Sequence, residues 1–74
     1  MAFEELQSVV LTHDIPEFDL RTGEIGTIVF VSQDGQHFEV EFVLPSGYTK
    51  ALATLTPHDL RAMTEKDSLT VRVS

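Results

Sequence analysis

Two His-Asp dipeptides are the residues of this chain whose types invite a catalytic or metal-binding interpretation. They are His13-Asp14 and His58-Asp59. A metal site needs three or four ligands and further groups that orient them, and adjacent residues on a strand point to opposite faces. We therefore expect neither dipeptide to chelate a metal. Asp14 is expected to cap or turn a loop, and Asp59 to accept hydrogen bonds from free backbone donors of a short 3₁₀ turn.

Other catalytic chemistry finds little support in the residue types. The chain has no cysteine, and its serines lack the sequence context of an activated nucleophile. Glu39 and Glu41 are two residues apart on one predicted strand, so their carboxylates share a face. Paired carboxylates need a cleft that perturbs their pKa values before they do acid–base work. We therefore interpret them as a charged surface, and predict no catalytic residue, no metal ligand, no cofactor and no enzymatic activity.

Short runs of strand-forming residues, separated by turn signals, predict the elements that position these side chains. The Asp-Gly pair at 34–35 is typical of a hairpin turn, and the segment 56–60 of a 3₁₀ turn with proline at its first position. Phe38, Val40 and Phe42 alternate with polar residues, which predicts a strand with one buried and one exposed face. The predicted strands cover residues 8–11, 26–31, 37–42, 49–55 and 60–63.

The order of these elements predicts the fold class, which is all-β: a small SH3-like five-stranded antiparallel barrel. A long early loop over 12–23, two tight hairpins and a 3₁₀ turn before the last strand are typical of that fold. The barrel is expected over 8–63, after a lead-in over 1–7. The tail over 64–74 contains an alternating run at 69–73, which predicts either an extra C-terminal strand or an edge that pairs with another chain, including a second copy in a homo-oligomer.

Net charge and composition indicate which classes of partner and which cellular compartment are expected. The net charge is −7, and residues 1–41 hold nine acidic residues against one basic residue. Such a surface repels nucleic acid and favours a basic protein partner, although acidity for solubility alone is an equal alternative. No run approaches the roughly 20 apolar residues of a membrane-spanning helix. Without cysteine, and with acidic residues where a signal peptide is basic, the sequence favours the cytoplasm and no membrane partner.

Two loops carry apolar side chains that are candidates for binding a protein partner. In the long loop, Ile15 and Leu20 are expected to fold back into the core. Phe18 in that loop and Tyr48 in the second hairpin are the aromatic residues expected to be at least partly exposed. The alternative is that both aromatic rings plug the ends of the barrel. The predicted partner-binding residues are Phe18, Glu39, Glu41 and Tyr48.

The sequence also resembles a bacterial family of small stand-alone proteins, the domain-of-unknown-function family 4926. The segments that carry the resemblance are VVLTHDIP at 9–16, LRTGEIGTIV at 20–29, FEVEF at 38–42 and LTPHDLR at 55–61. The resemblance implies an SH3-like barrel and offers no catalytic residues to carry over. Family members tend to lie in gene neighbourhoods suggestive of toxin–antitoxin or toxin–immunity pairs, which implies an antitoxin or immunity role.

Two alternative functions remain open beside the protein-binding module. Gly23 and Gly26, followed by β-branched residues, also occur in ribosome-associated and nucleic-acid-binding barrels of the KOW kind, but Glu24 stands here where such barrels are basic. The other alternative is a small structural subunit of a larger complex. The two glycines have a plain structural explanation, since they allow backbone conformations or close approaches that a side chain would block.

Overall fold

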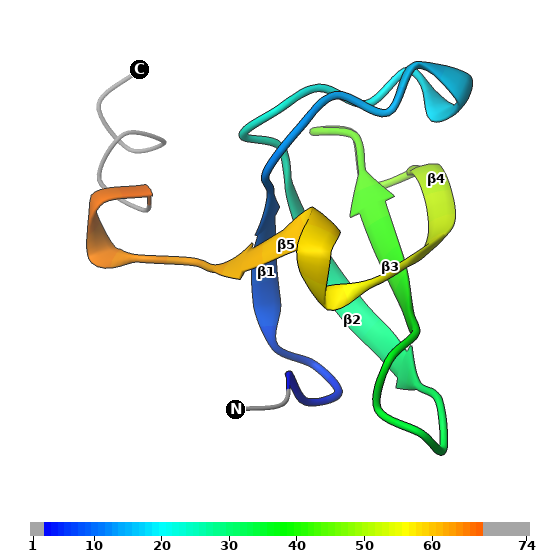
Figure 1. Cartoon of the computed structure of the whole chain (residues 1–74). Helices are drawn as coiled ribbons and strands as arrows, with labels where there is room; N and C mark the ends of the chain where they lie inside the picture. Colours follow the sequence, from blue (N-terminus) through cyan, green and yellow to red (C-terminus); the bar gives the residue numbers. More distant parts are fainter. Residues whose placement is uncertain (1–2, 68–74) are drawn as a thin grey trace.

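A computed structural model describes residues 3–67 as a small all-β domain (Figure 1). Among these residues, no helix is long and apolar enough to cross a membrane. Each predicted strand is present, with ends that differ by at most one or two residues from those expected. The elements are β1 (Ser8–Leu11), η1 (Pro16–Phe18), β2 (Ile25–Val31), β3 (Phe38–Val43), β4 (Thr49–Leu55), η2 (Pro57–Asp59) and β5 (Leu60–Ala62).

The five strands form one antiparallel sheet in the order β4-β3-β2-β1-β5. The last strand, β5, thus lies beside the first, β1. The sheet is open, with β4 and β5 at its edges, so the hydrogen bonds do not close the predicted barrel. The long loop and the β3–β4 turn lie at the same end of the sheet (Figure 1). The alternating run at 69–73 lies outside the described residues.

One face of the curved sheet forms the core, as the alternation in β3 predicts. Phe38, Val40 and Phe42 are all buried. Val40 pairs with Ile28 of β2 on one side and with Ala53 of β4 on the other, and these three residues are fully buried. The core is therefore centred on β3 and extends across its neighbouring strands.

The long loop between β1 and β2 closes this core and is more ordered than the sequence indicates. Ile15 and Leu20 are buried as predicted, and they form an antiparallel bridge in which each backbone N–H donates to the other residue's carbonyl. Three of the four residues between them form the 3₁₀ turn η1, where the sequence predicts only irregular loop. Pro16 supplies the backbone angle of a first helical position at no cost in hydrogen bonds. Asp19 ends the turn with a left-handed φ of 57°.

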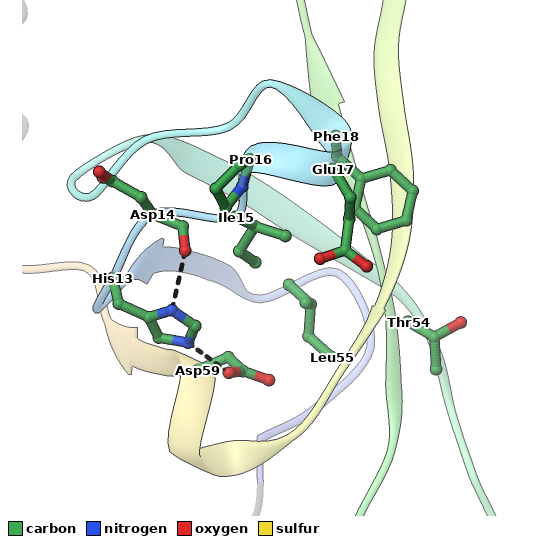
Figure 2. Close-up of a pocket in the computed structure, with 9 residues that line it drawn as sticks. All are labelled: His13, Asp14, Ile15, Pro16, Glu17, Phe18, Thr54, Leu55 and Asp59. Atoms are coloured by element: carbon green, nitrogen blue, oxygen red, sulfur yellow. Dashed lines mark hydrogen bonds and ion pairs between the residues drawn. The ribbon is translucent and has the colours of Figure 1, made fainter.

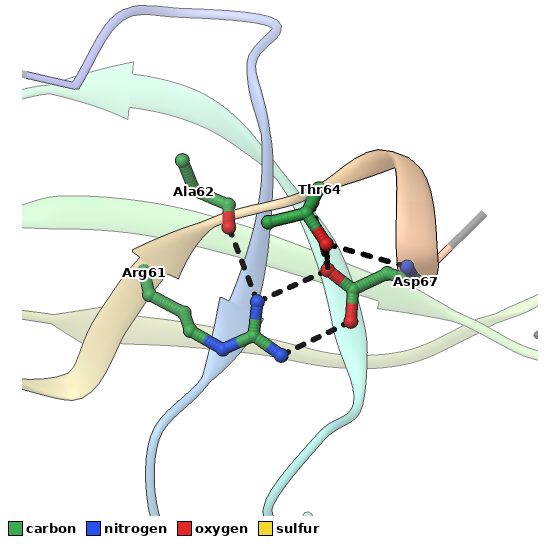
Figure 3. Close-up of polar contacts among 4 residues, drawn as sticks. All are labelled: Arg61, Ala62, Thr64 and Asp67. Carbon is green, nitrogen blue, oxygen red and sulfur yellow. Dashed lines mark hydrogen bonds and ion pairs between the residues drawn. The ribbon is translucent and has the colours of Figure 1, made fainter.

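The chain that follows β5 is held by an ion pair and a cap (Figure 3). Arg61 donates from both terminal nitrogens to the two carboxylate oxygens of Asp67, each at 3.0 Å. The backbone N–H of Thr64 donates to the same carboxylate at 2.7 Å, and residues 65–67 are helical. The Arg61 hydrogen bond, followed by those of Thr64, holds the pKa of Asp67 well below its usual range. Residues 65–67 therefore form a helical turn capped at Thr64.

The two glycines near the start of β2 serve different purposes. Gly23 has a φ of 92°, a left-handed conformation that L side chains rarely adopt. Gly26 instead lies where β2 and β3 approach closely. A Cβ atom there would stand 2.7 Å from Cγ1 of Val40, 2.8 Å from a ring carbon of Phe42 and 3.0 Å from the carbonyl oxygen of Glu41.

The close approach at Gly26 predicts a loss of stability when any side chain is introduced. Gly26→Ala is expected to lower the free energy of unfolding by about 1–3 kcal/mol, because the new methyl group overpacks the core. Gly26→Val should cost more, since its side chain is larger. Urea unfolding followed by circular dichroism measures both. Equal stability of the wild type and Gly26→Ala would contradict the packing described here.

Candidate functional site

The outer face of β2, β3 and β4 mixes exposed apolar side chains with carboxylates. The strand register places Phe30, Glu39 and Thr54 in one cross-strand row. The next row holds Thr27, Glu41 and Leu52. Phe30 is 53% exposed and Leu52 is 55% exposed, so both present apolar surface on this face. Neither row contains a lysine or an arginine.

Both carboxylates on this face are held by threonines of β4. Thr54 donates from its hydroxyl to Glu39 at 2.7 Å, and Thr49 donates to Glu41 at 2.6 Å. Each carboxylate keeps further acceptor positions, because an ionised carboxylate offers about four. The prediction that Glu39 and Glu41 share one strand face is confirmed, and the face now includes Phe30 and Leu52, which the sequence analysis did not place there.

A cavity of about 220 Å³ lies between the long loop, the end of β4 and η2 (Figure 2). Ile15, Pro16, Phe18 and Leu55 supply its apolar walls. Its polar lining comes from two chain segments far apart in sequence, which supply His13, Asp14 and Glu17 from the long loop and Thr54 and Asp59 from the chain around η2. The cavity therefore exists only because the long loop folds back over the sheet.

The two His-Asp dipeptides meet beside this cavity, one residue from each. Nε2 of His13 lies 2.5 Å from Oδ1 of Asp59, across a sequence separation of 46 residues. Nδ1 of the same ring lies 2.9 Å from the backbone carbonyl of Asp14. The other Asp59 oxygen accepts from the backbone N–H and the hydroxyl of Thr56, at 2.8 and 3.0 Å. Asp59 thus bonds the start of η2, as predicted, and also clamps the long loop to it.

The surroundings of this clamp favour the charged form of both partners. A carbonyl oxygen is only an acceptor, so Nδ1 of His13 carries a proton, and Nε2 faces a carboxylate that also accepts. The Asp59 hydrogen bond, followed by that to the Asp14 carbonyl, raises the pKa of His13 above its ordinary value of 6.5. For Asp59, burial favours the neutral acid, but the hydrogen bonds from Thr56 and His13 outweigh it and lower the pKa.

Asp14 holds the other end of the same loop. Its carboxylate accepts from the backbone N–H and the hydroxyl of Thr22, at 2.7 and 2.9 Å. These hydrogen bonds, led by the one from the backbone, lower the pKa of Asp14. The predicted role of Asp14 in turning the loop is confirmed. The carboxylate of Asp14 is directed to Thr22, so Asp14 lines the cavity with its backbone and does not offer it a free carboxylate (Figure 2).

The four predicted partner-binding residues fall into three places. Glu39 and Glu41 lie together on the outer face. Phe18 is 40% exposed at the cavity, and Tyr48 is 76% exposed in the β3–β4 turn. Neither aromatic residue is buried, so the alternative in which both plug the barrel is wrong. Thr54 connects two of the places, because it pairs with Glu39 and also lines the cavity.

The contact between His13 and Asp59 is not predicted from the sequence, because no local spacing indicates that residues from the two dipeptides meet. The repeated His-Asp pair was the available signal. Among residues 3–67, no group of three or more histidine, aspartate or glutamate side chains is placed to hold a metal ion.

The fold and the site define a small all-β domain built on one open five-stranded antiparallel sheet, with an acidic and apolar outer face and a small cavity beside the long loop. The family model described as "Domain of unknown function (DUF4926)" matches residues 5–62, and the chain belongs to that family. No curated protein and no solved structure matches the chain. The resemblance to this family is thereby confirmed. Because the family is described as one of unknown function, the surface of the protein is the basis for the proposed function.

The clamp predicts a raised pKa for His13 that depends on Asp59. In an NMR titration, His13 should titrate above 6.5, and Asp59→Asn should bring its pKa down towards that value because the facing charge is removed. Asp34→Asn is the matched control, since Asp34 lies 3.8 Å from His37 and is not bonded to His13. An unchanged His13 titration in Asp59→Asn would contradict the clamp.

The same clamp predicts a pH window of stability. His13 has a raised pKa in the folded state, so its contribution is complete below 6.5 and is lost as the pH rises through the raised value. Asp59 has a lowered pKa, so its contribution is present above 3.8 and is lost as the pH falls through the lowered value. The stability difference between wild type and His13→Ala should therefore be largest at mildly acidic pH and shrink at alkaline pH, as measured by urea unfolding across that range.

Proposed function

We propose that this chain is a protein-binding module, without enzymatic activity of its own, whose partner is a basic protein. The observation that carries the proposal is the outer face of β2, β3 and β4, where Phe30 and Leu52 flank Glu39 and Glu41. Exposed apolar side chains within a polar surround are typical of surfaces that another protein covers. Glu39 and Glu41, which are predicted to bind a partner, therefore lie on the same face as two exposed apolar side chains.

The charge of this face supports a basic partner in particular. Two carboxylates lie among apolar side chains without a basic residue in either row. Removing water from such carboxylates is costly unless the partner supplies a cation to each of them. A partner with lysine or arginine at matching positions is therefore accepted, whereas a neutral or acidic one is rejected. Nucleic acid is disfavoured by the same argument, because its phosphates meet carboxylates.

An antitoxin or immunity role is the finer form of this proposal. A basic toxin is one kind of protein that an acidic face of this type would fit, and the gene neighbourhoods implied by the family resemblance agree with it. In that role, the outer face would cover the basic surface with which the toxin engages its target. We propose a cytoplasmic location for this function, in keeping with the absence of cysteine.

Charge reversal on the outer face tests the proposal. The chain is co-expressed with the products of its neighbouring genes, and the affinity for a co-purified partner is measured by calorimetry. Glu39→Lys/Glu41→Lys should weaken binding by about tenfold or more and reduce its salt dependence, because two attractive contacts become repulsive.

The matched control is Glu4→Lys/Glu5→Lys, which changes the net charge equally at two exposed residues before β1. It should bind like the wild type. Circular dichroism checks that both double variants are folded. Equal weakening by the two double variants would indicate attraction by net charge alone, and unchanged binding by Glu39→Lys/Glu41→Lys would rule out the outer face as the binding surface.

A further inference from the structure

We propose that the cavity between the long loop and η2 is a subsite for a single arginine side chain of the protein partner. This inference rests on the proposed function, since it names the residue type by which a basic partner would be recognised. Three properties of the cavity carry it: its size, its unpartnered carboxylate and its aromatic wall. The other protein-binding surface, the outer face, lies next to it through Thr54.

The size of the cavity suits one side chain. Its volume of about 220 Å³ is below the range of roughly 300–1,000 Å³ that is typical of sites for small molecules and cofactors. The walls formed by Ile15 and Leu55 are apolar, and a long aliphatic stem would lie against them. A short polar side chain would leave these walls uncovered.

The charge of the cavity selects a cation. Two carboxylates face it, those of Glu17 and Asp59; His13 also lines it and pairs with Asp59, which leaves the charge of Glu17 unbalanced because no lysine or arginine lines the cavity. Both oxygens of Asp59 are already bonded, to His13 and Thr56. Glu17 differs, because among the described residues no hydrogen bond or ion pair engages its carboxylate. In Figure 2 that carboxylate points from η1 towards the end of β4, where an entering cation would meet it.

The aromatic wall favours arginine over lysine. Phe18 lies at the cavity beside β4, and the residue is 40% exposed although its side chain is a large apolar group (Figure 2). A guanidinium group is planar and weakly hydrated, so it stacks on an aromatic face while donating two hydrogen bonds to one carboxylate. Glu17 and Phe18 are consecutive residues of the same turn, and both line the cavity. Glu17 would therefore accept the hydrogen bonds of one guanidinium group while the ring of Phe18 stacks against its plane.

The position of the cavity suits a partner that also covers the outer face. Thr54 donates its hydroxyl to Glu39 on the outer face and lines the cavity as well. A partner seated on Phe30 and Glu39 therefore reaches the cavity by extending one side chain past the edge of β4. Arginine in the cavity would fix how the partner is oriented, while the outer face supplies the contact area.

A peptide titration followed by NMR tests the subsite. The probe is the tripeptide acetyl-Gly-Arg-Gly-amide, added to the ¹⁵N-labelled full chain. Amide signals of Glu17, Phe18 and Leu55 should shift in a saturable way, at millimolar concentrations because one side chain supplies few contacts. The same peptide with citrulline, which is nearly the same shape but neutral, should bind about fivefold or more weakly, because the charge-assisted contact is lost.

Matched variants locate the binding. Glu17→Gln keeps the shape of the side chain and should weaken arginine-peptide binding by about fivefold, and Phe18→Ala should do the same. Asp19→Asn removes an equal charge two residues away, outside the cavity lining, and should change nothing. Equal binding of the citrulline peptide, equal weakening by Asp19→Asn, or the absence of shifts at the cavity would each overturn the proposal.

The partner protein separates this inference from the proposed function. If Glu39→Lys/Glu41→Lys abolishes partner binding while Glu17→Gln and Phe18→Ala leave it unchanged, the outer face stands and the arginine subsite is wrong. If Glu17→Gln weakens the partner and the arginine peptide by similar factors, both are supported. If the arginine peptide causes no shifts and none of these variants changes binding of the partner, both the arginine subsite and the proposed function are overturned.

Discussion

The burial of Ile15 and Leu20 is the constraint on which the rest of this structure depends. A single curved sheet in so short a chain leaves its inner face open at one end, and Ile15 and Leu20 of the long loop join the core there. The two residues bridge each other and enter the core, so the four residues between them must turn outward. Glu17 and Phe18 are exposed because Ile15 and Leu20, the buried residues at the two ends of the turn, direct the residues between them outward. The loop's contribution to the core thus also places Glu17 and Phe18 at the surface.

The polar contacts around this loop serve the same constraint. Asp14 closes the loop onto Thr22, and His13 joins it to Asp59 at the far end of the chain. Both contacts are at the surface, where ion pairs contribute little to stability by themselves. Their effect is to hold the long loop in one position, since few of its residues contact the core. The cavity walls keep their shape because the loop is held at both ends, by the core on one side and by these carboxylates on the other.

The fold was largely predictable from the sequence, and the site was not. Alternation in β3 and the Asp-Gly turn are local signals, and the burial of Phe38, Val40 and Phe42 followed from them directly. The outer face requires the register: Phe30 joins Glu39 only because a bulge in β2 shifts the pairing after Ile28. The contact of His13 with Asp59 requires the return of β5 beside β1. Neither bulge nor strand order can be read from spacing along the chain.

The carboxylates of the outer face also account for why its apolar residues can remain exposed. If two copies of the chain met through this face, Glu39 and Glu41 of one would oppose those of the other, and four negative charges would lose water together. The face therefore disfavours self-association while leaving Phe30 and Leu52 available. Under the proposed function, a partner that brings positive charge removes the penalty and covers the apolar area at once. The same carboxylates would then oppose self-association of the protein and select the partner.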